Sequence, residues 1–290
     1  MARLPVGIAL SGGTARSVLH VGVLKALSES GIPIDYIAGT SGGSIAASMY
    51  AFGEPIEVME KVATGLSWWK LASIRFSRLG FISSRPIEVF LDKTFQGARF
   101  EDLAIPCAVP VTDLVTGERV TFRSGPVARV VRASCSIPQI YLPVEINGRR
   151  YVDGAMSEYL PVESVQTLGP QFTIGVNLDT RNDAYVAPRH KLGVIAQFVG
   201  MVARQNVVRS VQQADYILHP DVDGYSPFDF SAAGELIDLG YRYTLEHMDE
   251  IRRQWRRKSG WLGRLAARMK RRRLDESLFE HGVYQRSWRA

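Results

Sequence analysis

The sequence has no uninterrupted apolar segment long enough to cross a lipid bilayer. A spanning helix needs about 20 consecutive apolar residues, whereas the apolar runs of this 290-residue chain, such as residues 6–10 and 36–38, are broken by Gly, Asp or Ser within a few positions. The run near the N-terminus is also too short for the core of a signal peptide, and no cleavage site follows it. We therefore expect neither a transmembrane helix nor a cleaved leader.

Cysteine is also scarce. The chain contains only Cys107 and Cys135, and apolar or small residues surround both. Two cysteines cannot form the multiple disulfides that stabilise small secreted domains, and thiols in such surroundings are usually buried. The composition therefore indicates a reduced, cytoplasmic protein.

Positive charge is concentrated in one segment and scarce elsewhere. The formal net charge is +6, but residues 249–273 contain eleven Lys or Arg against Asp249 and Glu250, a net charge of +9. The rest of the chain therefore carries −3. A nucleic-acid-binding core would spread its basic residues over folded elements, so we expect no nucleic-acid partner for the body of the protein.

Strand and helix patterns alternate from the start of the chain. Residues 6–10 are typical of a buried strand, a helical pattern then runs to Gly31, and a strand at 36–38 precedes a helix at 44–52. This order indicates a parallel sheet with crossover helices. The predicted fold class is α/β, with a central, mostly parallel sheet flanked by helices. Further strands are expected at residues 105–113, 119–122, 144–146, 150–152, 172–178 and 216–219, and a further helix at 194–213.

The domain organisation follows from the same patterns. Residues 1–248 contain no repeat or linker and predict one catalytic domain, which a basic, amphipathic C-terminal tail at 249–290 follows. Residues 54–100 resemble a largely helical insertion within that domain, which makes them a candidate lid. The insertion contains several large apolar side chains, namely Trp68, Trp69, Phe76 and Phe81.

A Gly-x-Ser-x-Gly pattern at residues 39–43 has the form of a nucleophile elbow. In such an elbow the nucleophile occupies a tight turn between a strand and a helix, and Gly39 and Gly43 are needed because side chains there would collide. The start of a helix also provides free N–H groups and the positive end of a dipole near a developing anion. Ser41 is therefore the candidate nucleophile.

A glycine-rich loop follows the first strand. Its sequence, SGGTARS at residues 11–17, has neither the spacing of a dinucleotide fingerprint nor the Gly-Lys-Ser/Thr ending of a P-loop. With a nucleophile elbow on the next strand, an oxyanion hole is the better interpretation. The candidate donors are the N–H groups of Gly12, Gly13 and Thr14. Arg16 either fixes the loop or attracts an anionic head group, and the structural role is favoured.

An Asp-Gly pair, Asp153 and Gly154, closes the second strand of a predicted hairpin. Taken alone, such a pair is most often only a turn. Together with the other two motifs, it places a carboxylate at the end of a strand. Asp153 is therefore the candidate base.

These three segments in this order resemble the patatin-like phospholipase family, especially its bacterial members. The resemblance rests on SGGTAR, GTSGGS and RASCSIPQIYLPVEINGRRYVDGA, and it extends over about residues 6–180. It implies a three-layer patatin-like fold, with Ser41 as nucleophile and Asp153 as the base of a catalytic dyad. Gly12, Gly13 and Thr14 with Arg16 match the oxyanion loop.

The sequence departs from the family pattern at four positions. Thr14 and Ser17 occupy positions where the family's loop usually has Gly. Glu158 and Tyr159 replace the Asn residues often found after the Asp-Gly pair, although Pro161 is kept. These departures concern the backbone of the loop and the substrate preference rather than the nucleophile or the base.

The resemblance implies a serine esterase that acts on lipid acyl esters through an acyl-enzyme intermediate, as a phospholipase A or a lysophospholipase. No metal or cofactor is expected. The same site would be a transacylase if another alcohol replaced water. A second alternative is a catalytically silent lipid-binding or scaffold protein that keeps the fold.

A Ser–Asp–His triad is also open, because His190, His219 and His247 all follow Asp153 in the chain. His219 is the best of them, since it ends a predicted strand. His20 lies within the first helix and is expected to be structural. The dyad is favoured because the oxyanion loop matches the dyad family.

The basic tail is a candidate for membrane attachment. Apolar residues alternate with Arg and Lys there, and three of them, Leu262, Leu265 and Met269, share one helical face, with Trp255 and Trp261 nearby. A basic amphipathic helix can lie on an anionic membrane surface, which would place the protein at the inner membrane face. The alternatives are a solvated helix, a tail without a partner, or nucleic-acid binding through the tail alone.

Overall fold

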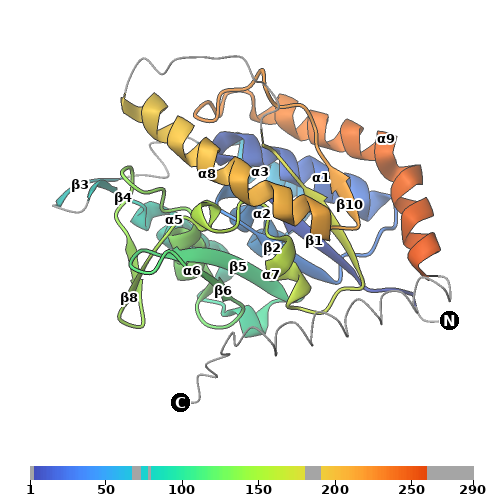
Figure 1. The fold of residues 1–290 in the computed structure, drawn as a ribbon, viewed down its shortest axis with the longest axis horizontal. Helices are drawn as coiled ribbons and strands as arrows, with labels where there is room; N and C mark the ends of the chain where they lie inside the picture. The colour runs from blue at the N-terminus through green and yellow to red at the C-terminus, as the bar shows by residue number, and fades with distance from the viewer. Residues whose placement is uncertain (1–2, 67–72, 78–79, 180–190, 260–290) are drawn as a thin grey trace.

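The computed structural model describes residues 3–66, 73–77, 80–179 and 191–259, which form a sheet covered by helices on both faces (Figure 1). The sheet has eight strands, and β6 (Arg119–Phe122) pairs with β5 beside the main path. The order along that path is β10 (Tyr216–Leu218), β9 (Phe172–Val176), β1 (Val6–Leu10), β2 (Tyr36–Gly39), β5 (Cys107–Asp113), β8 (Arg149–Val152) and β7 (Val144–Ile146).

The strands from β10 to β5 run parallel, and β6, β8 and β7 add an antiparallel edge. In the centre, Ile8 of β1 pairs with Ile37 of β2 and with Ile174 of β9. Strands β1, β5 and β9 are buried along their whole length, as expected where helices cover both faces of a parallel sheet. The predicted fold class and the mostly parallel sheet are confirmed.

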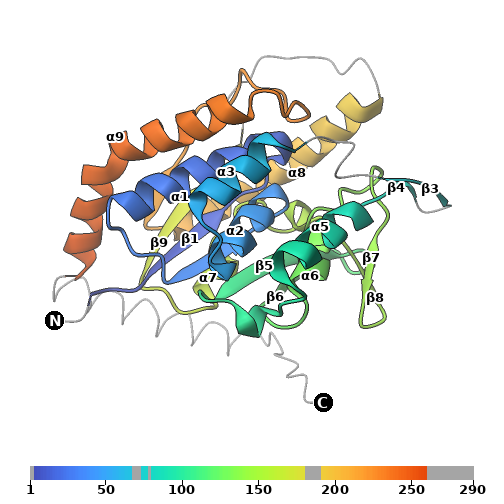
Figure 2. The ribbon, with the colours of Figure 1, turned by 180° about the vertical axis from the view of Figure 1, so that it is seen from behind.

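Alternating side chains of β1 supply two separate cores. Ile8 belongs to the larger core, whereas Ala9 points into the smaller one on the other face. Figures 1 and 2 show the helices that cover each side. The larger core lies under α1 (Leu19–Glu29), α2 (Gly42–Phe52), α3 (Ile56–Thr64), α5 (Arg85–Phe95), α6 (Val127–Ser134) and α9 (Ala233–Ser259). The smaller core lies under α7 (Val162–Gln166) and α8 (Lys191–Gln213).

Helix α9 continues past the expected domain boundary at residue 248. Ile251 is fully buried, the Trp255 indole donates to the Leu4 carbonyl oxygen at 3.2 Å, and Lys258 pairs with Asp215 at 2.6 Å. The apolar stripe of the helix therefore extends into the segment that the charge pattern had assigned to the tail. Residues 260–290, with the rest of that segment, lie outside the described part of the chain.

The insertion at 54–100 is only partly helical. Between α3 and α5 it contains the antiparallel strands β3 (Ser73–Ser77) and β4 (Gly80–Ser83). The expectation of a largely helical insertion is corrected here, because apolar residues alternate in Ser-Ile-Arg-Phe-Ser with the period of a strand. Trp68 and Trp69 lie outside the described residues, and the function of the insertion as a lid stays a prediction.

Within the described ranges, no helix combines the length and the hydrophobicity that crossing a bilayer requires.

Candidate active site

Ser41 lies in the turn between β2 and α2 with an unusual backbone conformation. Its φ of 50° and ψ of −127° are rarely adopted by residues with a side chain. The turn is tight enough to exclude Cβ atoms on both sides. A Cβ on Gly39 would lie 2.2 Å from the Gly43 carbonyl oxygen, and one on Gly43 would lie 2.4 Å from the Ser11 carbonyl oxygen. The collisions expected from the Gly39-x-Ser41-x-Gly43 spacing are therefore present.

Asp153 faces Ser41 from the end of β8. The Ser41 hydroxyl donates to Asp153 Oδ2 at 2.8 Å, and the Ala155 N–H donates to Oδ1 at 2.9 Å. The carboxyl group is 2% exposed, and this burial raises the pKa of Asp153 to about 7, although the hydrogen bonds from Ala155 and Ser41 act in the opposite direction. Asp153 is therefore a stronger base for a hydroxyl than an ordinary carboxylate.

The position of Asp153 depends on its glycine neighbour and on β5. A Cβ on Gly154 would lie 2.2 Å from the Pro110 carbonyl oxygen, so only glycine allows this approach. The Thr112 hydroxyl donates to the Asp153 carbonyl oxygen at 2.9 Å. The Asp-Gly pair thus forms a turn after β8 and also brings the backbone into close contact with β5.

Ser134 is a site residue that the motif analysis did not identify. Its hydroxyl accepts the Ser41 N–H at 3.0 Å and donates to the Pro110 carbonyl oxygen at 2.8 Å. The side chain is fully buried at the end of α6. It connects the strained turn of Ser41 to β5, the strand beside Asp153. No local pattern marks this serine, because its partners lie 93 and 24 residues away.

The glycine-rich loop leaves two backbone donors open. The Gly12 N–H donates to the Tyr159 carbonyl oxygen at 3.0 Å, and the Ala15 N–H donates to that of Pro227 at 3.0 Å. By contrast, the N–H groups of Gly13 and Thr14 have no backbone acceptor among the described residues. The candidate donors are therefore Gly13 and Thr14, because Gly12 is already engaged.

The two departures in this loop, Thr14 and Ser17, contact each other. Thr14 has a φ of 52°, in the left-handed region that favours glycine, and the Ser17 hydroxyl donates to the Thr14 carbonyl oxygen. Arg16 donates through Nε to the Tyr225 carbonyl oxygen at 2.7 Å, and burial lowers the pKa of its guanidinium group. This bond is the loop-fixing contact that the sequence analysis favoured for Arg16.

The departure at Glu158 is also structural. Its buried carboxylate accepts the Ser164 N–H at 3.1 Å and pairs with Arg119 at 3.3 Å, although burial still raises the pKa of Glu158. Its carbonyl oxygen accepts the Thr40 hydroxyl at 2.8 Å. Tyr159 lies against the loop, since a Cβ on Gly12 would be 2.9 Å from its ring. Glu158 and Tyr159 therefore fix the segment to which they belong in its place beside the elbow.

The described histidines hydrogen-bond to groups other than Ser41 and Asp153. In the described part of the chain, neither Ser41 nor Asp153 makes a hydrogen bond to a histidine. His219 Nε2 lies 2.8 Å from the Asp179 carbonyl oxygen, and His247 Nδ1 lies 2.8 Å from that of Tyr243. His190 lies outside the described residues.

His20 is a buried structural residue, as expected. Its Nε2 lies 2.8 Å from the Ser11 carbonyl oxygen, and burial lowers the pKa of its ring to about 4. The neutral ring therefore supports the start of the glycine-rich loop at neutral pH.

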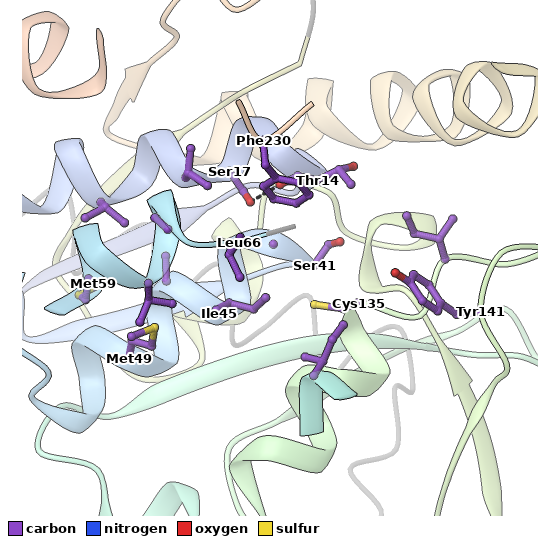
Figure 3. Close-up of a pocket in the computed structure, with 18 residues that line it drawn as sticks. Thr14, Ser17, Ser41, Ile45, Met49, Met59, Leu66, Cys135, Tyr141 and Phe230 are labelled. Carbon is purple, nitrogen blue, oxygen red and sulfur yellow. Dashed lines mark hydrogen bonds between the residues drawn. The ribbon is translucent and has the colours of Figure 1, made fainter. Parts of the chain in front are cut away.

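An apolar cavity opens beside Ser41 (Figure 3). It offers about 710 Å³ of empty space, part of which is open to solvent, and its lining is mostly aliphatic or aromatic. Ile45 and Met49 follow Ser41 at intervals of four residues and lie on one face of α2. In Figure 3, Met49 and Met59 lie at the opposite end from Tyr141, with Ser41 between. Met49 and Met59 are only 2% and 1% exposed, so both side chains at this end are buried.

The sequence model of the patatin-like phospholipase family matches residues 8–165 of the chain. This match covers more than half of the sequence and includes the glycine-rich loop, the elbow and Asp153. The chain belongs to the patatin-like phospholipase family. The family resemblance identified from the three motifs is thereby confirmed.

Curated relatives are much longer than this family member. It is 27% identical over 278 residues to "Lysophospholipase NTE1" of Pyricularia oryzae, an alignment that covers 85% of this chain and 18% of that protein. It is 28% identical over 281 residues to "Patatin-like phospholipase domain-containing protein ZK370.4" of Caenorhabditis elegans, an alignment that covers 85% of this chain and 21% of that protein. The chain thus spans about a fifth of the length of these relatives.

Solved structures of low sequence identity share the fold. VipD from Legionella pneumophila superimposes with a TM-score of 0.56 at 15% identity, over 86% of this chain and 67% of that one. ExoU from Pseudomonas aeruginosa, solved in complex with SpcU, superimposes with a TM-score of 0.51 at 14% identity, over 86% of this chain and 53% of that one. Both confirm the three-layer α/β fold that the family resemblance implies.

Proposed function

We propose that this patatin-like protein is a carboxylic ester hydrolase that cleaves lipid acyl esters, as a phospholipase A or a lysophospholipase, through a Ser41–Asp153 dyad. The observation that carries the proposal is the 2.8 Å hydrogen bond from the Ser41 hydroxyl to the buried Asp153 carboxylate. It lies at the wall of an apolar cavity suited to an acyl chain. The relatives named as lysophospholipases support the same substrate class.

Acylation follows from this geometry. Asp153 accepts the hydroxyl proton while Ser41 Oγ attacks the ester carbonyl carbon, and the carbonyl oxygen becomes an oxyanion. The N–H groups of Gly13 and Thr14 would hold that oxyanion, each well-placed donor being worth about 3 kcal/mol. When the tetrahedral intermediate collapses, the C–O bond to the leaving alcohol breaks. Asp153 returns its proton to that alcohol and leaves an acyl-Ser41 ester.

Deacylation reverses the same steps with water as the nucleophile. Asp153 removes a proton from water, the hydroxide attacks the acyl-Ser41 carbonyl, and the fatty acid leaves as Ser41 regains its proton. Another alcohol in place of water would make the protein a transacylase. Measuring the ratio of free fatty acid to acylated alcohol in the presence of added glycerol separates the two outcomes.

The first experiment measures hydrolysis of p-nitrophenyl butyrate by the wild type, Ser41→Ala, Asp153→Asn and His219→Ala. We expect kcat/KM to fall by at least about 1,000-fold in the first two variants, because each removes an atom of the proton-transfer step. His219→Ala should keep its activity within about threefold. Loss of activity in His219→Ala would establish a triad instead. An inactive wild type, on this ester and on lysophospholipid, would leave the silent lipid-binding protein as the better hypothesis.

The basic tail is the second element of the proposal. We propose that residues 260–290, with the basic end of α9, attract the protein to anionic membranes at the inner membrane face. The tail segment at 260–273 carries six Lys or Arg and no acidic residue, and each basic residue near such a surface contributes about 1 kcal/mol. Replacing Arg271, Arg272 and Arg273 by Gln should weaken binding to anionic vesicles at low salt and leave p-nitrophenyl butyrate hydrolysis unchanged.

A further inference from the structure

Helix α8 exposes an unusual number of large apolar side chains. Ten such side chains are exposed in the described parts of the molecule, and five of them lie on this one helix. Among the other large apolar side chains that the structure describes, only Val115, in the turn between β5 and β6, is more than half exposed. The exposed large apolar side chains described on α8 are Val194 (55%), Phe198 (56%), Met201 (51%), Val208 (61%) and Val211 (37%).

Four of these side chains form a stripe along the outer face of α8. At 3.6 residues per turn, Val194, Phe198, Met201 and Val208 fall within an arc of about 80°. The opposite face of the helix is attached to the domain. Val207 and Ser210 are buried there, and the Asn206 amide donates to the Met156 carbonyl oxygen at 3.1 Å. The outward direction of the stripe is therefore fixed by packing.

The same helix adjoins the lining of the active-site cavity. Ile195 packs against the buried cluster of Ile137, Ile140 and Tyr141, and two members of this cluster, Ile137 and Tyr141, line the cavity beside Ser41. Further along, the partner of Asn206 belongs to the short helical turn that directly follows Asp153. In Figure 1, α8 crosses the outside of the molecule on the face opposite α1 and α3. Helix α8 therefore packs both against residues that line the cavity and against the turn that follows Asp153.

We propose that the outer face of α8 is the surface by which the protein docks onto a phospholipid layer. The stripe defined by Val194, Phe198, Met201 and Val208 would insert into the layer at the boundary between head groups and acyl chains. The helix contains Lys191, Arg204 and Arg209 and no acidic residue. Arg209 pairs with Glu163 of α7 at 2.7 Å, so the positive charge that complements anionic head groups comes from Lys191 and Arg204. This proposal rests on the proposed function only in taking the layer as the source of substrate.

Contact at this place would bring a lipid to Ser41 without crossing water. A lipid leaving the layer beside Ile195 meets Tyr141 and Ile137, and then the apolar cavity. An exposed apolar stripe of this kind is costly on a protein that remains in water. The attraction of the tail to the membrane is electrostatic, whereas that of the stripe is hydrophobic. A high salt concentration should therefore weaken binding through the tail and leave binding through the stripe.

The test uses the full chain with Ser41→Ala, so that binding is measured without turnover. Its partitioning onto vesicles of phosphatidylcholine and phosphatidylglycerol is compared with that of Phe198→Gln/Met201→Gln in the same background. We expect at least tenfold weaker partitioning of the triple variant, and part of the binding of the Ser41→Ala parent should persist at about 1 M salt, where charges are screened beyond about 3 Å. The matched control, Leu114→Gln/Val115→Gln, removes two exposed apolar side chains elsewhere and should bind within twofold of the parent.

With Ser41 intact, the Phe198→Gln/Met201→Gln variant should hydrolyse p-nitrophenyl butyrate within twofold of the wild type but lose activity on vesicles. The proposal is overturned if the double variant binds vesicles as well as the control, or if binding vanishes at high salt in every protein. It is also overturned if the wild type is a dimer that the double variant converts to a monomer, because a second copy would then cover the stripe. An inactive wild type that still binds vesicles through Phe198 and Met201 would refute only the esterase.

Discussion

Burial of a single carboxyl group sets the chemistry expected at this site. Asp153 is 2% exposed, and loss of hydration disfavours its charged form more than the N–H of Ala155 and the hydroxyl of Ser41 stabilise it. A carboxylate of ordinary pKa is a weak base for an alcohol. The same burial therefore makes Asp153 a better base and moves its titration into the neutral range.

The pH dependence of the reaction follows from this shift. Asp153 must be ionised to accept the Ser41 proton, and its raised pKa of about 7 means that the carboxyl is mostly protonated below that pH. We expect kcat/KM for p-nitrophenyl butyrate to rise tenfold per pH unit at low pH and to level off above about pH 7. A profile that is flat from pH 5 to pH 9, as it would be for a carboxyl group of ordinary pKa, would contradict the assignment.

Ser134 is expected to act as a positioning residue for the nucleophile. Ser134→Ala leaves the buried Ser41 N–H without its acceptor, a loss of about 1–3 kcal/mol, and loosens the strained turn. We expect kcat to fall about tenfold or more with KM little changed. Ser48→Ala removes another buried hydroxyl, whose acceptor is the Ile45 carbonyl oxygen, and is the matched control. Equal kcat values for the two variants would show that the Ser134 bond is only structural.

Helix α2 combines two functions because its N-terminus and one of its faces meet the same cavity. Ser41 caps the helix, and Ile45 and Met49 line the cavity further along. The helix axis therefore runs along the direction that an acyl chain bound to Ser41 would take. At 1.5 Å per residue, the distance from Ser41 to Met49 along this axis is about 12 Å.

That length predicts the preferred acyl chain. An extended alkyl chain advances about 1.3 Å per carbon, given a C–C bond of about 1.5 Å, so chains of about nine carbons would reach Met49 and Met59. We expect Met59→Ala to shift the optimum of a p-nitrophenyl ester series to longer chains and Met59→Trp to shift it to shorter ones. The neighbouring Val58 is 37% exposed and does not line the cavity, so Val58→Ala should leave the optimum unchanged. If neither Met59 variant changed the optimal chain length, the acyl chain would have to bind elsewhere.

The packing of α1 against α9 concerns the whole molecule, because it joins the first and last described helices. A Cβ on Gly22 would lie 1.9 Å from the Ile237 carbonyl oxygen, and one on Gly240 would lie 2.4 Å from that of Leu19. The two helices are therefore in backbone contact. This contact closes the layer that covers the larger core.

Two glycine substitutions test this contact. Gly22→Ala must separate α1 from α9, and we expect it to lower the free energy of unfolding by about 3 kcal/mol. Gly234→Ala lies on α9, where an added Cβ meets nothing within 4 Å, and should raise that free energy by up to about 1 kcal/mol. Urea denaturation measures both. Similar stabilities for the two variants would mean that the helices can move apart at little cost.

The motifs that short-range sterics impose were predictable from the chain. Gly39, Gly43 and Gly154 are required because backbone atoms approach within the space of a side chain, and such spacing is visible as a pattern. The apolar runs likewise predicted the parallel sheet, since a strand that is buried on both faces has apolar side chains on both. Fold class, elbow and Asp-Gly pair therefore follow from residues close together in sequence.

Features that depend on contacts between distant segments emerged only from the folded chain. Ser134 is important because its partners are Ser41 and Pro110, and Gly12 is not an open donor because the Tyr159 carbonyl oxygen reaches its N–H. Helix α9 passes residue 248 because Leu4 and Asp215 provide contacts for its last turns. The periodicity of α8 also does not say which face is inside, and packing against Met156 turns Phe198 outward. A pattern sets which side chains share a face, and the rest of the fold decides what that face meets.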